Sequence, residues 1–117
     1  MLPDLDFDVG ETDPVRKLIV LALCMAHVDG ATALAFGPTP LDGSNTPFRY
    51  EIEGAWHDFP PLPNTMRSVA AELEAMAGIS QVAREGILER TVDGARMRWR
   101  VVVTAAGAEY LLTPLPV

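Results

Sequence analysis

A two-residue turn signal constrains this chain more than any other feature. Asp93-Gly94 stands between two runs, GILERTV and ARMRWRVVV, in which polar and apolar residues largely alternate. Alternation with a period of two indicates β-strands, and Asp-Gly between two such runs strongly favours a tight hairpin. The sequence therefore predicts an antiparallel hairpin over the last third of the chain.

The register of this hairpin follows from the turn. With Asp93 and Gly94 as the two loop residues, Glu89 faces Arg98 and Thr91 faces Arg96 on one side of the sheet. The opposite side is apolar. Its residues are Leu88, Val92, Met97, Trp99 and Val101.

Two helices are expected. Asp13-Pro14 is an N-cap acid followed by proline, apolar residues follow at helical spacing, and Asp29-Gly30 closes the helix. Asn64 is placed to cap a second helix that ends at Gly78. The apolar stripe of this second helix comprises Met66, Val69, Ala70, Leu73 and Met76 or Ala77.

The remaining strands complete an α+β pattern. TALAF (32–36) reads as a buried strand, residues 46–53 and 55–59 as a hairpin, and EYLLT as a last strand after a turn at Ala106-Gly107. The run PPLP (60–63) reads as a stiff link into the second helix. We expect two helices packed on one face of a mainly antiparallel sheet. The domain spans residues 13–117, after an acidic flexible lead-in at 1–12.

Length and charge bound the function. The 117 residues suit one domain, and the net charge of −7 arises within residues 1–60, which hold ten acids and three bases. An acidic chain argues against nucleic-acid binding as the main activity. No apolar run approaches the roughly 20 residues of a membrane helix, and no signal-peptide pattern opens the chain. We therefore expect a cytoplasmic protein.

Few residues are placed for catalysis or metal binding. The bases on offer are His27 and His57, and no serine stands in a recognisable nucleophile elbow. Cys24 and His27 are three apart on a helix, but a closed zinc site needs four ligands, so a buried cysteine and a helix-end histidine are favoured. We expect no enzymatic activity and no cofactor or metal.

The alternating arginines are the remaining candidates for a site. Arg96, Arg98 and Arg100 point to one face of one strand. They could receive an acidic partner surface, or they could form a solvated sheet face with cross-strand pairs such as Glu89–Arg98. Both readings stay open at this point, and phosphate binding ranks below either.

The order of the motifs resembles that of a known family. VRKLIVLALCMAHVDG leads to ATALAFGP, RYEIEG is followed by AWHDFPPLP, and EGIL opens a segment that closes with WRVVVTAAGAEYLL. Over residues 14–114 this is similar to the PAS-like N2 domain that precedes the ATPase core in bacterial type II secretion and type IV pilus motors. The chain departs from the family at Ala33, Ala35 and Gly37, where the family has Asp, His and Glu, and it contains no Walker segments.

The resemblance implies a non-enzymatic interaction domain. Its partner would be a secretion or pilus ATPase or another component of that protein-transport system. Arg49 matches a family position whose basic residue helps engage a neighbouring subunit, so Arg49, Arg96 and Arg98 are the expected partner-binding residues. The alternative is a PAS-like small-ligand sensor that would use Tyr50 and His57 beside apolar walls. Oligomeric state does not follow from the sequence.

Overall fold

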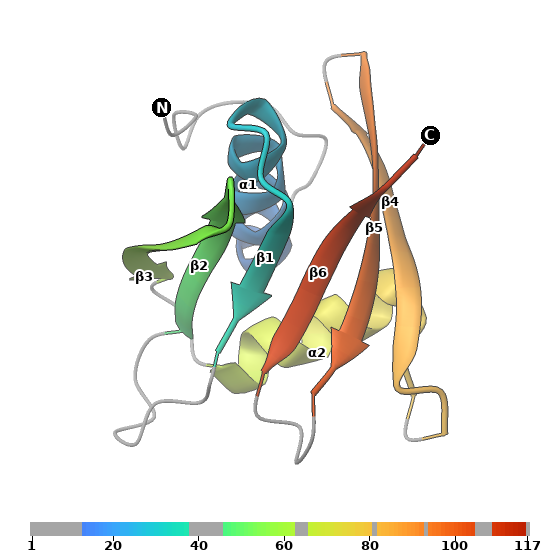
Figure 1. Cartoon of the computed structure of the whole chain (residues 1–117). Helices are drawn as coiled ribbons and strands as arrows, with labels where there is room; N and C mark the ends of the chain where they lie inside the picture. The colour runs from blue at the N-terminus through green and yellow to red at the C-terminus, as the bar shows by residue number, and fades with distance from the viewer. Residues whose placement is uncertain are drawn as a thin grey trace.

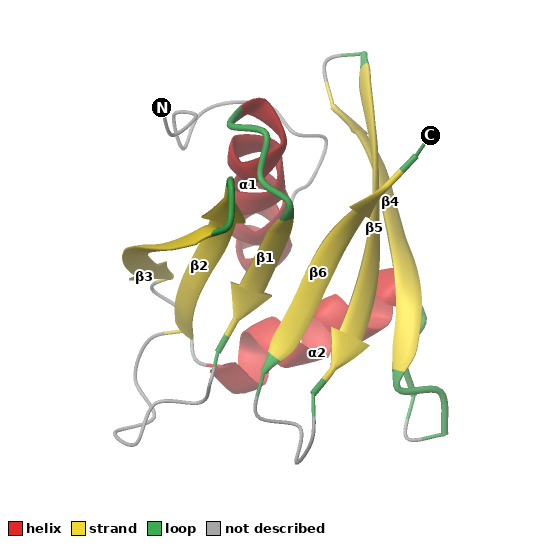
Figure 2. Ribbon diagram, in the orientation of Figure 1, coloured by secondary structure: helices red, strands yellow, loops and turns green. Residues whose placement is uncertain are grey.

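The computed structural model describes residues 13–37, 46–62, 66–80, 82–92, 94–104 and 109–116. The elements are α1 (Pro14–Val28), β1 (Ala33–Phe36), β2 (Thr46–Ile52), β3 (Ala55–Leu62), α2 (Met66–Ala77), β4 (Glu85–Val92), β5 (Ala95–Val103) and β6 (Tyr110–Leu115). Both helices lie behind the sheet in the view of Figure 1, and Figure 2 shows the same two layers coloured by secondary structure. The predicted α+β architecture is confirmed.

The sheet is built from two three-stranded meanders. Its six strands run in the order β3-β2-β1-β6-β5-β4, and each neighbouring pair is antiparallel. The meanders join where β1 pairs with β6, with Leu34 opposite Leu112. All four residues of β1 are buried, as predicted for this strand. The two outer strands, β3 and β4, form the edges of the sheet.

The predicted helix signals have the expected roles. The Asp13 carboxylate accepts hydrogen bonds from the backbone N–H groups of Val15 and Arg16, each at 3.0 Å, and Pro14 occupies the first helical position. Gly78 ends α2 with a φ of 70°, in the left-handed region. The predicted cap Asn64 lies outside the described residues, as do residues 1–12 and the turn at Ala106-Gly107.

The hairpin at Asp93-Gly94 has the predicted register. Val92 pairs with Ala95, Glu89 with Arg98 and Leu88 with Trp99. Gly94 has a φ of 79°, which this tight turn requires. On the side that faces the helices, Leu88 and Trp99 are almost fully buried. The alternation read from the sequence therefore places the apolar residues toward the core.

One predicted boundary is wrong. The run PPLP (60–63) is predicted to link the hairpin to the second helix. Instead, β3 continues through Pro60 and Pro61 to Leu62, which pairs with Thr46. Proline lacks the N–H that a central strand needs, but β3 is an edge strand and needs no donor on its outer side. The register also shifts between Thr46 and Phe48, where the prolines lie opposite.

Two tyrosines connect the sheet to the helices. The Tyr50 hydroxyl on β2 donates to Asp29 at the end of α1, and the Tyr110 hydroxyl on β6 donates to Glu74 on α2. Burial and then the bonded carboxylate raise the pKa of both phenols, to about 12 for Tyr110. Each helix is thus joined to the sheet by a polar contact at the margin of the apolar core.

A glycine sets the distance between α2 and β4. A Cβ atom at Gly86 would lie 1.9 Å from the carbonyl oxygen of Ala77, at the last residue of α2. No side chain fits at that separation. Gly86 is therefore the position at which the helix backbone packs directly onto the strand.

Candidate interaction surface

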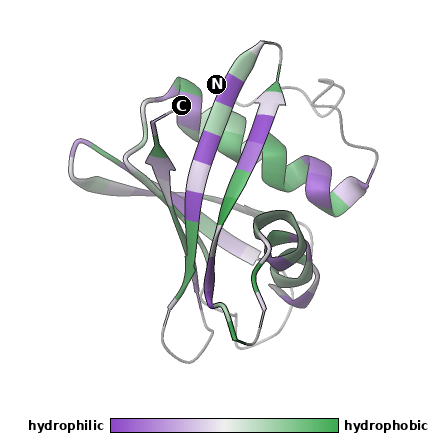
Figure 3. Cartoon of the chain, turned by 90° about the vertical axis from the view of Figure 1, so that its right-hand side faces the viewer, coloured by the Kyte–Doolittle hydropathy of each residue, from purple (hydrophilic) through white to green (hydrophobic). Residues whose placement is uncertain are grey.

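The side of the sheet opposite the helices is the open face. Side chains alternate along each strand, so every residue between two core residues lies on this face. Figure 3 shows hydrophilic and hydrophobic residues alternating along the strands near the β4 edge. The members that matter below are Trp56, Arg49, Leu115, Arg96, Arg98, Arg100, Glu85, Ile87 and Glu89.

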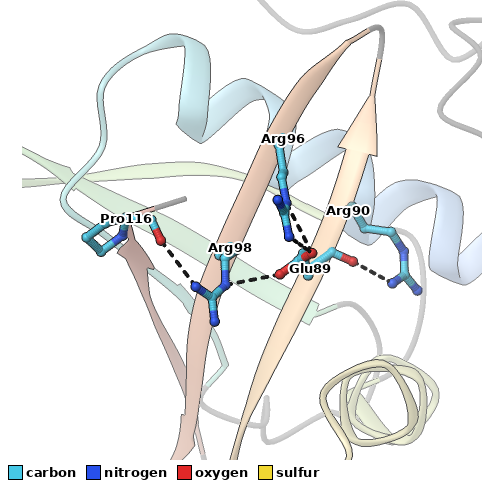
Figure 4. A network of polar contacts seen from close by, with 5 residues as sticks. All are labelled: Glu89, Arg90, Arg96, Arg98 and Pro116. Carbon is cyan, nitrogen blue, oxygen red and sulfur yellow. Dashed lines mark hydrogen bonds and ion pairs between the residues drawn. The ribbon is translucent and has the colours of Figure 1, made fainter.

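Glu89 joins two of the predicted partner-binding arginines. Its Oε1 accepts hydrogen bonds from Nε and Nη2 of Arg96 at 3.2 and 2.7 Å, while its Oε2 lies 3.0 Å from Nε of Arg98 (Figure 4). The Arg98 contact is an ion pair without hydrogen-bond alignment, so that buried Nε–H has no aligned acceptor. Nη1 of Arg98 also donates to the carbonyl of Pro116 at 3.4 Å. The hydrogen bond from Arg96 is the main cause that lowers the pKa of Glu89.

A second ion pair lies beside an apolar hollow. Arg100 donates from Nε and Nη2 to Oε2 of Glu85, at 2.9 and 2.6 Å. Next to this pair is a hollow of about 350 Å³, lined by Glu85, Gly86, Ile87, Arg100 and Leu115. Ile87, at the wall of this hollow, is 48% exposed. The β4–β5 part of the open face therefore combines paired charges with an accessible apolar centre.

Arg49 lies in a different part of the open face. Its Nη2 is 3.3 Å from Oε2 of Glu109, immediately before β6, so the contact crosses β1. Its guanidinium also stacks on the ring of Trp56, 4.6 Å from the centroid. Trp56 is 40% exposed on the outermost strand, so it packs on the sheet through this arginine.

The structure brings together two of the three predicted site residues. Arg96 and Arg98 share Glu89 on the β4–β5 hairpin, whereas Arg49 on β2 is separated from β5 by β1 and β6. At about 4.8 Å per strand, that separation is about 14 Å. Sequence reasoning found Glu89 from the hairpin register but missed Glu109, because the β1–β6 pairing that places it cannot be read from local spacing.

The other polar candidates lie apart from this surface. Cys24 is buried in α1, as predicted from the sequence. Burial raises the pKa of its thiol. His27 is exposed at the end of α1, and His57 is exposed on β3. Among the described residues, no group of three His, Cys, Asp or Glu side chains is arranged to hold a metal ion.

Comparisons with known proteins add no assignment. The chain matches no protein-family model and no curated protein. Of the two helices in the described part of the chain, neither has the length and apolar character needed to cross a membrane.

Proposed function

We propose that this chain is a non-enzymatic protein-interaction domain that docks on a motor ATPase of the type II secretion or type IV pilus kind, or on another component of such a system, in the cytoplasm. The motif order described above motivates the choice of partner. The element order helix, strand, hairpin, helix and three-stranded meander is compatible with it.

One observation carries the proposal of docking. On the open face, β5 presents three arginines against two glutamates of β4, and the exposed Ile87 lies among them. The chain as a whole has a net charge of −7, so this excess of positive charge is local. Arginine is enriched in protein interfaces, where its planar guanidinium can donate two parallel hydrogen bonds to one carboxylate.

The paired arginines remain accessible to a partner. The side chains of Arg96 and Arg100 are 58% and 54% exposed, although each already binds a glutamate. Such exposed pairs contribute about 0 to 1 kcal/mol to stability, so their contribution to the fold is small. Their other N–H groups can donate to an acidic partner surface without breaking the pairs. Binding through this surface should weaken as salt increases.

A PAS-like ligand sensor is less well supported. The Tyr50 hydroxyl, one of its two polar groups, is bonded to Asp29, and His57, the other, lies exposed on an edge strand. Met97 and Trp99 are buried within the apolar core. The observations therefore favour docking over ligand binding within the core.

Native mass spectrometry after gentle purification from the host cell tests the proposal. The expected result is a complex with a protein whose peptide masses identify it as a secretion or pilus ATPase or a component of that system. A complex with a small molecule alone, released on denaturation, would support the sensor and contradict docking. Recovery with no partner, at salt low enough to preserve ionic contacts, would also contradict docking.

A further inference from the structure

The two edges of the sheet differ in how they are protected against pairing. The β3 edge carries Pro60 and Pro61 and a register shift. The β4 edge, Glu85–Val92, contains no proline and no lysine, and it pairs with β5 in continuous register over eight residues. Exposed edges of this length are normally blocked by proline, lysine, bulges or a covering segment. The β4 edge is a template for another strand.

The backbone polarity of β4 can be derived from one hydrogen bond. The N–H of Val103 donates to the carbonyl of Arg84 at 3.1 Å, so the pair Arg84–Val103 is hydrogen-bonded. Hydrogen-bonded and non-hydrogen-bonded pairs alternate in an antiparallel ladder. The residues whose N–H and C=O groups point away from β5 are therefore Glu85, Ile87, Glu89 and Thr91.

The side chains of the same residues do not oppose an incoming strand. Charges on an edge prevent pairing when they are free, but Glu85 is bound to Arg100, and Glu89 to Arg96 and Arg98. Between them, Ile87 is exposed beside the 350 Å³ hollow. Within the part of the chain that the structure describes, this edge thus offers backbone groups without a neighbouring strand, carboxylates paired with arginines, and an apolar centre.

We propose that β4 pairs antiparallel with β4 of a second copy of this chain. A two-fold axis at Leu88 places Glu85 opposite Thr91 of the second copy and Ile87 opposite Glu89. In both of these pairs, the N–H and C=O groups that point away from β5 can bond across the interface. No two residues of like charge are directly opposite each other. An axis at Ile87 would instead place Glu85 opposite Glu89, which cross-strand pairing disfavours.

Self-pairing also fits the asymmetry of the sheet. Two copies joined at β4 form one twelve-stranded sheet, since each contributes six strands. Its outer edges are then both β3, whose prolines stop further addition, so the assembly closes at two copies. This inference is independent of the proposed function.

Sedimentation velocity from about 10 μM to about 1 mM tests the pairing, because an interface made of one strand pair is small. We expect the sedimentation coefficient to rise with concentration toward that of a dimer. Thr91→Pro removes an outward N–H without touching the β5 ladder, and Ile87→Lys places a charge at the edge. Both variants should remain monomeric with unchanged circular dichroism. Trp56→Lys, at the opposite edge, is the matched control and should dimerise as the parent does.

Cysteine cross-linking tests the register. In the variant Glu85→Cys/Thr91→Cys the two thiols of one chain lie six residues, about 20 Å, apart along the strand, so they cannot bond to each other. The proposed register predicts a covalent dimer on oxidation, whereas Glu85→Cys/Glu89→Cys should cross-link at least tenfold less. A parent protein that stays monomeric over the whole range would overturn the proposal. So would a dimer that persists in both Thr91→Pro and Ile87→Lys, and equal cross-linking of the two pairs would overturn the register.

Discussion

The hydroxyl of Tyr110 on β6 donates a hydrogen bond to the carboxylate of Glu74 on α2. The ring of Tyr110 is buried, so the hydroxyl reaches the edge of the core at the point where α2 crosses the sheet. A corresponding bond, from Tyr50 to Asp29, joins β2 to the end of α1. The two bonds hold the helix layer in place behind the face proposed to bind the partner.

Removing the Tyr110 hydroxyl should destabilise the protein. Tyr110→Phe deletes a hydrogen bond to a charged acceptor and leaves Glu74 partly buried without it, so we expect a loss of about 1.5 to 3 kcal/mol in the free energy of unfolding. Urea denaturation followed by circular dichroism measures this. Tyr110→Phe combined with Glu74→Gln should lose less than the sum of the single variants. Strict additivity would show that the two side chains do not interact.

The same bonds predict a loss of stability at alkaline pH. Folding raises the pKa of both phenols above the unfolded value of about 10. Their contribution is therefore fully present below pH 10 and is lost as the pH rises through the folded value, about 12 for Tyr110. We expect the melting temperature to fall between pH 10 and pH 12, with the steepest part of this fall reduced in Tyr110→Phe.

Tyrosinate absorbance at alkaline pH provides an independent check. The chain contains only two tyrosines, so the entire signal reports Tyr50 and Tyr110. In the folded protein it should develop well above pH 10, and in denaturant near pH 10. Titration near pH 10 in the folded protein would show that one of the two hydroxyls is not bonded as described.

Gly86→Ala should disrupt the packing of α2 on β4. The new Cβ would lie 1.9 Å from the backbone carbonyl of Ala77, and backbone cannot move aside as a flexible side chain can. We expect a loss of about 3 kcal/mol, at the upper end for overpacking. Thr91→Ala, on the exposed side of the same strand, is the control and should change stability by less than about 0.5 kcal/mol. Equal effects from the two changes would contradict the packing of α2 on β4.

Arg49→Ala should change the exposure of Trp56 more than it changes the stability of the fold. Its ion pair with Glu109 and its stacking on Trp56 are partly exposed, so together they contribute about 1 kcal/mol. The ring of Trp56 should become more accessible, and acrylamide should quench its fluorescence more strongly. The background variant Trp99→Phe isolates this signal, because the chain has two tryptophans and Trp99 is buried. Unchanged quenching would mean that Arg49 does not cover the ring.

The sequence was informative where structure is local. Asp13-Pro14 predicts a helix start and Asp93-Gly94 predicts a hairpin register, and the observed N-cap at Asp13 and the pairing of Val92 with Ala95 confirm both. Asp93 itself lies outside the described residues. The extent of β3 was misjudged because proline is tolerated at a sheet edge, and edge status depends on the strand order. That order also places Glu109 beside Arg49. The Arg96–Glu89–Arg98 cluster was predictable because its members lie within one hairpin.

The affinity of the co-purified partner for charge-altered variants tests the proposed docking surface. Arg96→Glu/Arg98→Glu reverses the charge of the proposed surface, and adding Glu89→Arg restores the internal ion pairs with opposite sign. Lys17→Glu/Arg67→Glu makes the same change in net charge on the two helices, away from the open face. We expect at least a tenfold weaker affinity for both variants altered at Arg96 and Arg98, with Lys17→Glu/Arg67→Glu binding like the parent. Unchanged affinity in both charge-reversed surfaces, with the fold intact, would contradict the assignment of this face as the docking site.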